Sequence, residues 1–323
     1  PITLEWVVIA PERAKRPTDF HRIKEAAPPA GASCPFCPDG SANSDKIAAY
    51  ETDRIALFKN RYPAFLESEA SCSRRDYLPD GRFFSSLPAL GGHDVIVIKD
   101  HQAQLYDFDQ ETWQQFCLVT KRRYQYWRED CHARYTMLIY NQGQPSGASI
   151  YHPHAQLFSS NIVSDRILLE LDGAKKYFDQ RQRCVFCQLL LQEKEAEIRV
   201  ICESDQFIAF TFYAARSPFE IWVLPKEHGA SFASITPAQI KNLATALGHV
   251  FGLLDQTLDQ PALNFFIHDR PTNSDQFDSY HWHIEIFPRL SLYGGYELGG
   301  GTIIDCLSPE DAAKYLRPTA RPQ

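Results

Sequence analysis

The chain has 323 residues, enough to bury a large core either as two domains or as one double-sized domain. Its net charge of -7 leaves no basic field that could hold DNA or RNA by neutralising phosphates, so no nucleic-acid partner is expected. No apolar run approaches the roughly 20 residues of a membrane span and no signal-peptide pattern opens the chain, so no membrane partner is expected. Because the sequence begins at Pro1, we expect that an initiator methionine or a short leader has been removed.

Strand and helix patterns alternate along the first half of the chain. Residues 6–10, 95–98 and 137–141 are rich in β-branched and aromatic side chains, which predicts strands. Apolar residues recur at rough helical spacing over 109–130, and we expect a helix there. Residues 66–92 lack clear periodicity and are predicted to form a loop.

The second half of the chain repeats these patterns. Thr236, Pro237 and Gln239 supply an N-cap, a proline at the first helical position and a capping-box glutamine, which predicts a helix over 237–256. Ser308 is expected to cap a short C-terminal helix in the same way. The remaining predictions are strands at 207–212, 263–268 and 284–287 and a loop at 269–279.

The two halves share four features in the same order: a C-x-x-C pair, a strand followed by a histidine, a helix, and an H-x-H motif. The spacing is nearly constant, with 127 residues from His101 to His228 and 129 from His152 to His281. Order, residue type and spacing agree throughout, which indicates a duplicated α+β unit. We place the first unit at residues 1–165 and the second at 166–323.

The cysteines indicate metal sites. Nine is an odd number, and four of them form two C-x-x-C pairs, a pattern that favours metal-bound thiolates in a reducing cytoplasm over a secreted disulfide frame. Zinc favours four thiolate and imidazole ligands, and each pair is matched by one histidine after the central strand and one in the H-x-H motif. The predicted ligands of two zinc sites are Cys34, Cys37, His101 and His152, and Cys184, Cys187, His228 and His281.

The alternative is that the two pairs are unrelated cysteines packed as small apolar groups. The matching histidines in both halves favour the metal interpretation. The other cysteines are interpreted as structural, and these are Cys72, Cys117, Cys131, Cys202 and Cys306.

The motif from His152 to Gln156 carries the predicted chemistry. In an extended strand, side chains at i, i+2 and i+4 share one face, so His152, His154 and Gln156 are expected to point the same way. If His152 binds zinc, His154 is left as a nucleophile for an activated phosphoryl group, which suggests two-step nucleotidyl transfer. Gln156 would hold a non-bridging oxygen. The alternative for His154 is a second metal ligand or a hydrogen-bonded buried histidine.

Three residues before this motif are candidates for orienting phosphates, because they lie on or beside a glycine-containing loop. They are Asn141, Ser146 and Ser149. In the second half, Glu285 stands where Gln156 stands in the first, and its negative charge would repel a phosphate. We therefore expect the second unit to support catalysis rather than perform it.

Six longer segments point to one family. They read EWVVIAPERAKRP (5–17), CPFC (34–37), KNRYPA (59–64), GASIYHPHAQ (147–156), YHWHIEIFPR (280–289) and GYELG (295–299). Together they resemble the galactose-1-phosphate uridylyltransferase family, a branch of the histidine-triad superfamily, over nearly the whole chain. Ala155 departs mildly from the pattern, since Gly or Ser is more usual there.

The resemblance implies a fold and a set of roles. The fold would be α+β, with two tandem histidine-triad-like units, each an antiparallel sheet with packed helices, in a cytoplasmic homodimer whose active sites lie at the subunit interface. His154 would be the nucleotidylated nucleophile and Gln156 the glutamine that marks transferases. Ser149 and Asn141 would contact phosphates. The remaining implied substrate-binding residues are Arg13 and Arg16 for phosphate, Asn60 for the nucleoside, and Tyr296 and Glu297 near the sugar.

The resemblance also implies the reaction, a ping-pong transfer of UMP from UDP-glucose to a hexose 1-phosphate such as galactose 1-phosphate, in galactose metabolism. The family's zinc-bearing second site is typical of members similar to plant ADP-glucose phosphorylase, so an adenylyltransferase that uses inorganic phosphate is the alternative. A non-enzymatic zinc-stabilised binding module is a third. In some members the second metal is iron, and the residues that would match its ligands are Glu170, His268, His281 and His283.

Overall fold

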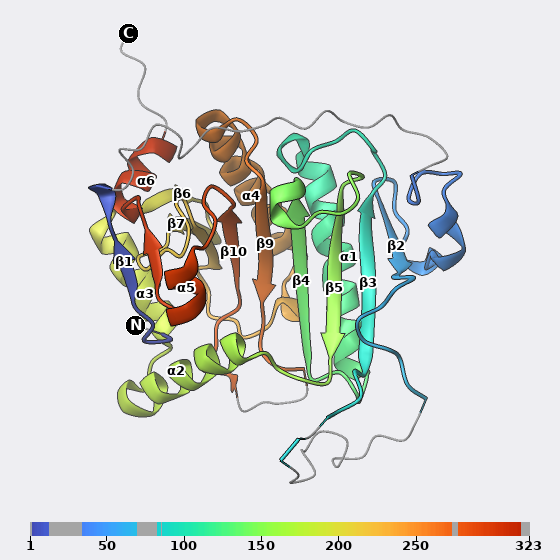
Figure 1. Ribbon diagram of the computed structural model, residues 1–323, viewed down its shortest axis with the longest axis horizontal. Coiled ribbons are helices and arrows are strands. Elements are labelled where there is room, and N and C mark those ends of the chain that lie inside the picture. Colours follow the sequence, from blue (N-terminus) through green and yellow to red (C-terminus); the bar gives the residue numbers. More distant parts are fainter. Residues whose placement is uncertain (1, 13–33, 70–82, 85, 273–276, 318–323) are drawn as a thin grey trace.

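The computed structural model describes residues 2–12, 34–69, 83–84, 86–272 and 277–317. Within them, one large antiparallel sheet of nine strands forms the centre of the molecule, in the order β2-β3-β5-β4-β9-β10-β8-β7-β6 (Figure 1). Its strands are β2 (Ile55–Lys59), β3 (Gly91–Ile98), β4 (Tyr135–Gln142), β5 (His154–Ser160), β6 (Val200–Glu203), β7 (Phe207–Thr211), β8 (Ile221–Pro225), β9 (Leu263–His268) and β10 (His283–Pro288).

The sheet consists of two tandem α+β units. Strands β2, β3, β5 and β4 form one half, and β7, β8, β10 and β9 form the other in the same internal order, with β6 added at the edge. The halves join where β4 pairs with β9, and Asn141 there lies opposite Asn264. Each unit is therefore an antiparallel sheet, and the two are related by an approximate two-fold axis between β4 and β9.

One helix from each unit covers the same face of the sheet. Helix α1 (Gln110–Glu129) contacts β2, β3 and β4, α4 (Pro237–Leu258) contacts β6 and β7, and the two helices pack against each other. Alternate strand residues point into this layer, as the two-residue period of a strand requires. They form one hydrophobic core with both helices, to which β5 contributes Ala155 and Leu157.

The opposite face is covered unevenly. Over the second unit lie α2 (Asp165–Arg181), α3 (Val185–Ala196) and the buried side chain of Ile2, which share a second core with β7 and β8. The segment β1 (Val7–Ile9) pairs in parallel with β11 (Ile303–Asp305) near the short helices α5 (Gly295–Gly300) and α6 (Pro309–Leu316). The N-terminal residues therefore pack on the second unit.

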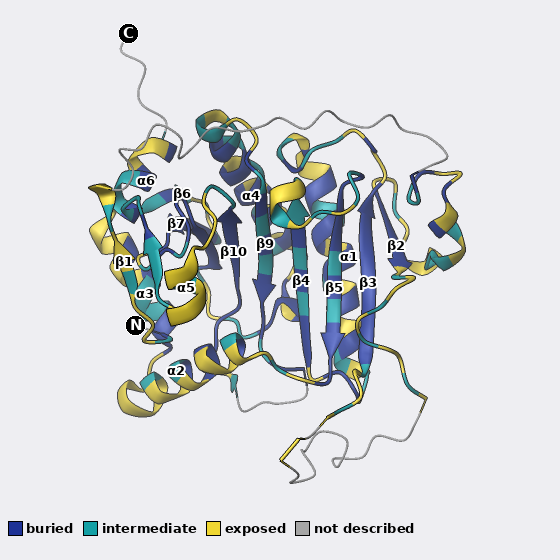
Figure 2. Cartoon of the chain, viewed as in Figure 1, coloured by how far each residue is buried: buried dark blue, intermediate teal, exposed yellow. Residues whose placement is uncertain are grey.

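The middle of the sheet is the less covered part of this face. Figure 2 shows half-buried stretches along β4, β5 and β9, in contrast to the buried strands on either side. The half-buried side chains there are Met137, Ile139, Gln156, Phe158 and Phe266. Of the first unit's motif residues, Gln156 lies in this open strip, next to the buried His154.

The structure confirms the predicted helices and strands, with bounds shifted by a few residues. Thr236 caps α4 through the predicted capping box, and the Ser308 side chain accepts a hydrogen bond from the Asp311 N–H at the start of α6. Helices α2 and α3 were not predicted, because exposed leucines such as Leu168, Leu169 and Leu191 blur their apolar stripes. Among helices of the described residues, none is long and apolar enough to cross a membrane.

Candidate active site and metal centres

The first cysteine pair forms a tight turn beside two histidines. Cys34 Sγ lies 3.4 Å from His152 Nδ1, and Cys37 Sγ lies 3.2 Å from His101 Nδ1. The turn closes through hydrogen bonds to the carbonyls of Cys37 and Pro35, and a Cβ at Gly40 would meet the Pro35 carbonyl oxygen at 2.3 Å. Glycine is therefore required for the turn that presents both sulfurs. All four predicted ligands are buried here, with their donor atoms within 4.8 Å of one another.

The tautomer of His152 favours a cation between these donor atoms. His152 Nε2 lies 2.7 Å from the carbonyl oxygen of Ile98 and must donate to it, so His152 Nδ1 carries a lone pair. That lone pair points at His101 Nδ1, 3.0 Å away. A tetrahedral zinc with bonds of about 2.0 to 2.3 Å separates its ligands by about 3.3 to 3.8 Å. The donor set and spacing therefore fit zinc.

The second cysteine pair repeats this arrangement. Cys187 Sγ lies 3.4 Å from His228 Nδ1 and 3.5 Å from His281 Nδ1, and Cys184 belongs to the same group. His228 Nε2 donates to the Asp278 carbonyl oxygen at 2.7 Å, so in the neutral ring Nδ1 presents its lone pair to the cluster. Hydrogen bonding with Cys187, aided by His228 and His281, lowers the pKa of the Cys184 thiol, which favours a thiolate ligand.

The other cysteines have different surroundings. Cys117 is buried in the main core, where burial raises the pKa of its thiol to about 12, and it is structural as predicted. Cys202 is half-buried and packs against the same core. Cys131 is disulfide-bonded, which the reducing environment inferred from the sequence does not predict. Cys72 lies outside the described residues.

His154, at the start of β5, is the candidate nucleophile. Its Nδ1 donates to the carbonyl oxygen of His152 at 2.8 Å, so Nε2 carries the lone pair, and within the described residues Nε2 makes no hydrogen bond. Burial lowers the pKa of His154, an effect only partly opposed by the bond to His152, so the neutral imidazole is favoured. Phe36 packs against both histidines, with ring centroids 5.9 Å from His152 and 5.5 Å from His154.

Gln156 follows His154 on the same face of β5 and is half-buried. Its Oε1 lies 2.9 Å from Nε2 of His93, a residue of β3 that belongs to no motif and was not predicted as a site residue. His93 also touches Asn60, whose Nδ2 lies 3.2 Å from the same ring nitrogen. The first unit therefore brings His154, Gln156 and Asn60 to one face of the sheet, with His93 between the last two.

The three candidate phosphate-orienting residues lie at the end of β4 and in the connection from β4 to β5. Asn141 stands near the end of β4, and its Oδ1 accepts a hydrogen bond of 2.7 Å from Asn264 of the second unit. Ser146 ends a short 3-10 helix and donates to the Gly143 carbonyl oxygen, while Ser149 is exposed on the following loop. Gly147 has a φ of 90°, in the left-handed region that favours glycine.

Two further predicted site residues, Tyr296 and Glu297, lie away from His154 within one chain. Arg13 and Arg16 lie outside the described residues. Tyr296 and Glu297 lie on α5, which contacts β11 on the second unit, and Figure 1 shows this helix well away from β5. Tyr296 is 61% exposed, so its ring is available to a molecule outside this chain.

The second unit replaces the nucleophile site with packed and charged groups. His283 donates from Nδ1 to the His281 carbonyl oxygen at 3.1 Å, as His154 does to His152. However, its ring is fully buried and stacks on Trp222, with centroids 4.4 Å apart. Glu285, in place of Gln156, binds Arg216. Both imidazoles of the second unit's motif, those of His281 and His283, are fully buried.

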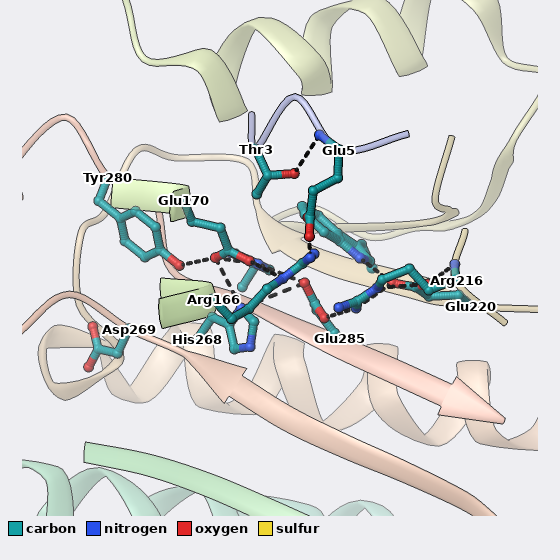
Figure 3. A network of polar contacts seen from close by, with 12 residues as sticks. Thr3, Glu5, Arg166, Glu170, Arg216, Glu220, His268, Asp269, Tyr280 and Glu285 are labelled. Carbon is teal, nitrogen blue, oxygen red and sulfur yellow. Dashed lines mark hydrogen bonds and ion pairs between the residues drawn. The ribbon is translucent and has the colours of Figure 1, made fainter. Parts of the chain in front are cut away.

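Figure 3 shows the buried charge network around this second motif. His268 Nδ1 lies 3.1 Å from Glu170 Oε2, and Tyr280 donates to the same oxygen at 2.8 Å. Arg166 Nε lies 3.3 Å from Glu170 Oε1, and Arg216 pairs with both Glu220, at 2.8 Å, and Glu285. The carboxylates of the network are therefore already paired with cations. Such pairing is needed because a buried carboxylate without a partner carries a large desolvation penalty.

The four residues that would match the ligands of an iron site fall into two different clusters. His281 lies with the cysteines of the second cluster, whereas Glu170, His268 and His283 lie with Glu285. Donor atoms of these last four residues also fall within 4.8 Å of one another, so the group could hold an ion. The cysteines Cys184 and Cys187 nevertheless give His281 a complete four-ligand set without Glu170 or His268.

Comparisons with known proteins agree with this arrangement. Family models for the N-terminal and C-terminal domains of galactose-1-phosphate uridyl transferase match residues 1–164 and 170–320. An ADP-glucose phosphorylase from Arabidopsis thaliana is 31% identical over 98% of this chain and 91% of its own length. A galactose-1-phosphate uridylyltransferase from Thermotoga maritima is 25% identical over 99% and 96%. The crystal structure of an Arabidopsis ADP-glucose phosphorylase with bound ADP-glucose superposes with a TM-score of 0.82 at 30% identity, covering 100% of this chain and 97% of that one.

Proposed function

The chain belongs to the galactose-1-phosphate uridyl transferase family, and we propose that it moves a nucleotidyl group from a nucleotide sugar to an acceptor phosphate through His154. It is a nucleotidyltransferase, as the family and its named relatives are. The observation that carries the assignment to His154 is its tautomer, because the Nδ1–H bond to the His152 carbonyl leaves Nε2 with a lone pair, on the face of the sheet opposite α1 and α4.

The reaction takes two steps. In the first, His154 Nε2 attacks the α-phosphorus of the nucleotide sugar, a P–N bond forms, and the P–O bond to the sugar phosphate breaks, so that the sugar 1-phosphate leaves with the electron pair. In the second, an oxygen of the acceptor phosphate attacks the same phosphorus and the P–N bond breaks. The His152 carbonyl stabilises the positive imidazolium of the intermediate. Gln156 would donate its amide to a non-bridging oxygen, while Asn141, Ser146 and Ser149 would orient the phosphates.

Two zinc ions per chain form part of the proposal. Zinc would be held by the two clusters built around Cys34 and Cys184, and it would act there as a structural cross-link. In the first cluster His152 would be fixed from one side while its carbonyl holds His154 from the other. The second ion would be zinc rather than iron, because two cysteines complete the ligand set of His281.

We propose UDP-glucose as donor and a hexose 1-phosphate, such as galactose 1-phosphate, as acceptor. This choice is supported by the family models and by relatives named galactose-1-phosphate uridylyltransferase. The second candidate is an ADP-glucose phosphorylase, with inorganic phosphate as acceptor. It is favoured by the 31% identity to a protein of that name and by a second Cys/His cluster of the kind expected for such members.

The position of Tyr296 and Glu297 supports a dimer. Tyr296 and Glu297 would contact the sugar from a second copy of the chain, since α5 lies far from β5 within one chain. We therefore propose a homodimer, located in the cytoplasm, in which each chain has units at 1–165 and 166–323. In it, Arg13 and Arg16 would bind phosphate and Asn60 would bind the nucleoside. Sedimentation equilibrium tests the dimer, and a monomer that retains full turnover would exclude it.

Isotope exchange tests the reaction. Labelled glucose 1-phosphate should enter UDP-glucose in the absence of any second substrate, because the first half-reaction is reversible on its own. Exchange into ADP-glucose instead would favour the phosphorylase. Replacing His154 by Ala should abolish exchange while both metals stay bound, and exchange retained by that variant would exclude His154 as the nucleophile.

A further inference from the structure

We propose that His93 is a positioning residue for Gln156. It fixes the carboxamide so that the N–H2 group, rather than the oxygen, faces the phosphoryl group under transfer. The inference rests on the proposed function, since it names the group that orients Gln156 during nucleotidyl transfer. His93 stands on β3, one strand away from the motif, and is 8% exposed.

The backbone N–H of Ala64 determines the tautomer of His93. The N–H of Ala64 lies 3.3 Å from His93 Nδ1 and can only donate, so Nδ1 must accept and carries no proton. Burial lowers the pKa of His93, although Gln156 and Asp94 oppose this effect, so the ring is neutral and holds one proton. That proton is therefore on Nε2.

The same proton fixes the amide of Gln156. His93 Nε2 lies 2.9 Å from Gln156 Oε1, and because Nε2 is the donor, Oε1 is the acceptor. The Nε2 of Gln156 is then left to donate to a ligand. Asn60 Nδ2, 3.2 Å from His93 Nε2, cannot donate to a nitrogen without a lone pair. The N–H of Tyr62 holds Asn60 Oδ1 at 2.9 Å, so the Asn60 amide hydrogens also remain available to a ligand.

Packing holds the ring in this orientation. His93 stacks on Phe158, with ring centroids 4.0 Å apart and planes inclined by 29°. The strand register places His93 opposite Phe158 and Val95 opposite Gln156, so the imidazole reaches Gln156 diagonally across β3 and β5. A ring held by a backbone N–H and an aromatic face has little freedom to rotate, and neither has the amide bonded to it.

The need for such a residue follows from the symmetry of an amide. The two ends of a carboxamide have almost the same shape, but only one donates hydrogen bonds. If Gln156 turned over, its oxygen would face the phosphoryl oxygens and repel them. A neutral donor at Oε1 excludes that state without adding a charge beside the phosphate, and this is what His93 Nε2–H provides.

The second unit makes the corresponding contact with different residues. Trp222 pairs with Glu285 as Val95 pairs with Gln156, which puts Glu220 in the position of His93. There Arg216 bridges Glu220 and Glu285. Both units thus connect the side chain at the Gln156 or Glu285 position to the one at the His93 or Glu220 position. The connection is an arginine ion pair in the second unit and a neutral hydrogen bond in the first.

A double-mutant cycle tests the inference by the single-turnover rate of His154 nucleotidylation at saturating nucleotide sugar. His93→Phe keeps the stack on Phe158 and removes both hydrogen bonds, whereas His93→Gln keeps a donor near Nε2. His93→Phe should lower the rate about tenfold in the wild-type background and have no further effect when Gln156 is already Ala. His93→Gln should recover the rate to within about threefold. Equal losses in both backgrounds, or no loss, would overturn the inference.

Nitrogen-15 spectra of histidine-labelled, zinc-loaded protein give a readout that does not depend on turnover. They should show His93 as the Nε2–H tautomer, with the Nε2–H resonance shifted when Gln156 is replaced by Ala. An Nδ1–H tautomer would overturn the inference even if catalysis is normal. Wild-type protein that forms no adduct would instead contradict the proposed function, so the two failures are distinguishable. Zinc content and Tm confirm that each variant is folded.

Discussion

Trp222 lies flat against His283, with ring centroids 4.4 Å apart and planes inclined by 19°. The strand register pairs Val95 with Gln156 as it pairs Trp222 with Glu285, so Val95 stands where Trp222 would be in the first unit. The smaller side chain leaves one face of His154 uncovered by an aromatic ring from that strand. Together with Phe186, whose ring centroid lies 5.2 Å from that of His283, Trp222 encloses the second motif's imidazole, although both motifs read H-x-H.

The two motif histidines should therefore respond differently to substitution. His154→Ala should abolish the first half-reaction without loss of metal. His283→Gln should retain its rate within about twofold but lower stability by about 1–3 kcal/mol, because Glu170 and Glu285 lose a buried neighbour. Rapid-quench nucleotidylation and denaturant unfolding of both variants provide the check. A dead half-reaction in folded His283→Gln would mean that the catalytic motif had been assigned to the wrong unit.

Metal content should follow the two cysteine clusters. Zinc-loaded protein should contain two ions per chain, as measured by plasma mass spectrometry. Cys187→Ser should lose one ion and keep nucleotidylation, whereas Cys37→Ser should lose the other and also slow nucleotidylation, because His152 would no longer be held from its Nδ1 side. Cys117→Ser is a matched control in the core, where both ions should remain. Three ions per chain would indicate occupation of the Glu170 network.

The ion pairs of Arg216 should contribute strongly to stability. Arg216→Met would leave Glu220 and Glu285 buried without their cation, and we expect a loss of about 3–5 kcal/mol in the free energy of unfolding. Changing both glutamates to Gln in the same chain should restore part of that loss. Arg181→Met, at an exposed position, is the surface control and should change stability by less than about 0.5 kcal/mol. A similar effect of both arginine substitutions would contradict the role of the network.

The stability of the protein should fall at alkaline pH through His268. Burial lowers the pKa of His268, but the charges of Glu170 and Glu285 outweigh it and raise the pKa above its ordinary value of 6.5. The folded state therefore binds the proton more tightly than the unfolded state, and this contribution is present below about pH 6.5 and lost as the pH rises through the folded-state pKa. Tm measured from pH 6 to 9 should fall more for the wild type than for His268→Gln. If Tm falls equally with pH in the wild type and in His268→Gln, the proton responsible is not on His268.

Both Cys/His clusters could be predicted from the sequence because their signals are short-range or repeated. Cys34 and Cys37 fix one half of a site by local spacing, and the second copy of the pattern identifies the distant histidines. The predicted common direction of the motif side chains holds for His154 and Gln156. His152, however, precedes β5, which begins at His154, and turns its Nδ1 towards the cysteines.

Other parts of the site depend on tertiary contacts that no local pattern encodes. His93 reads as one more residue of a buried strand, and only the register of β3 against β5 brings it to Gln156. Likewise, Glu285 suggests repulsion of phosphate in the sequence, but its pairing with Arg216 needs the structure. Tyr296 belongs to a sequence motif of the family, but its helix α5 lies away from β5 (Figure 1), and a motif match cannot indicate whether its residues act within one chain.

The central claim is that His154 carries the nucleotidyl group, and intact-protein mass spectrometry tests it most directly. The zinc-loaded protein would be incubated separately with UDP-glucose and ADP-glucose, and the modified peptide mapped. We predict one uridylyl adduct per chain, located on His154 and absent from His154→Ala. An adenylyl adduct on His154 would keep the mechanism and change the donor. No adduct from either nucleotide sugar, or an adduct on another residue, would contradict the account.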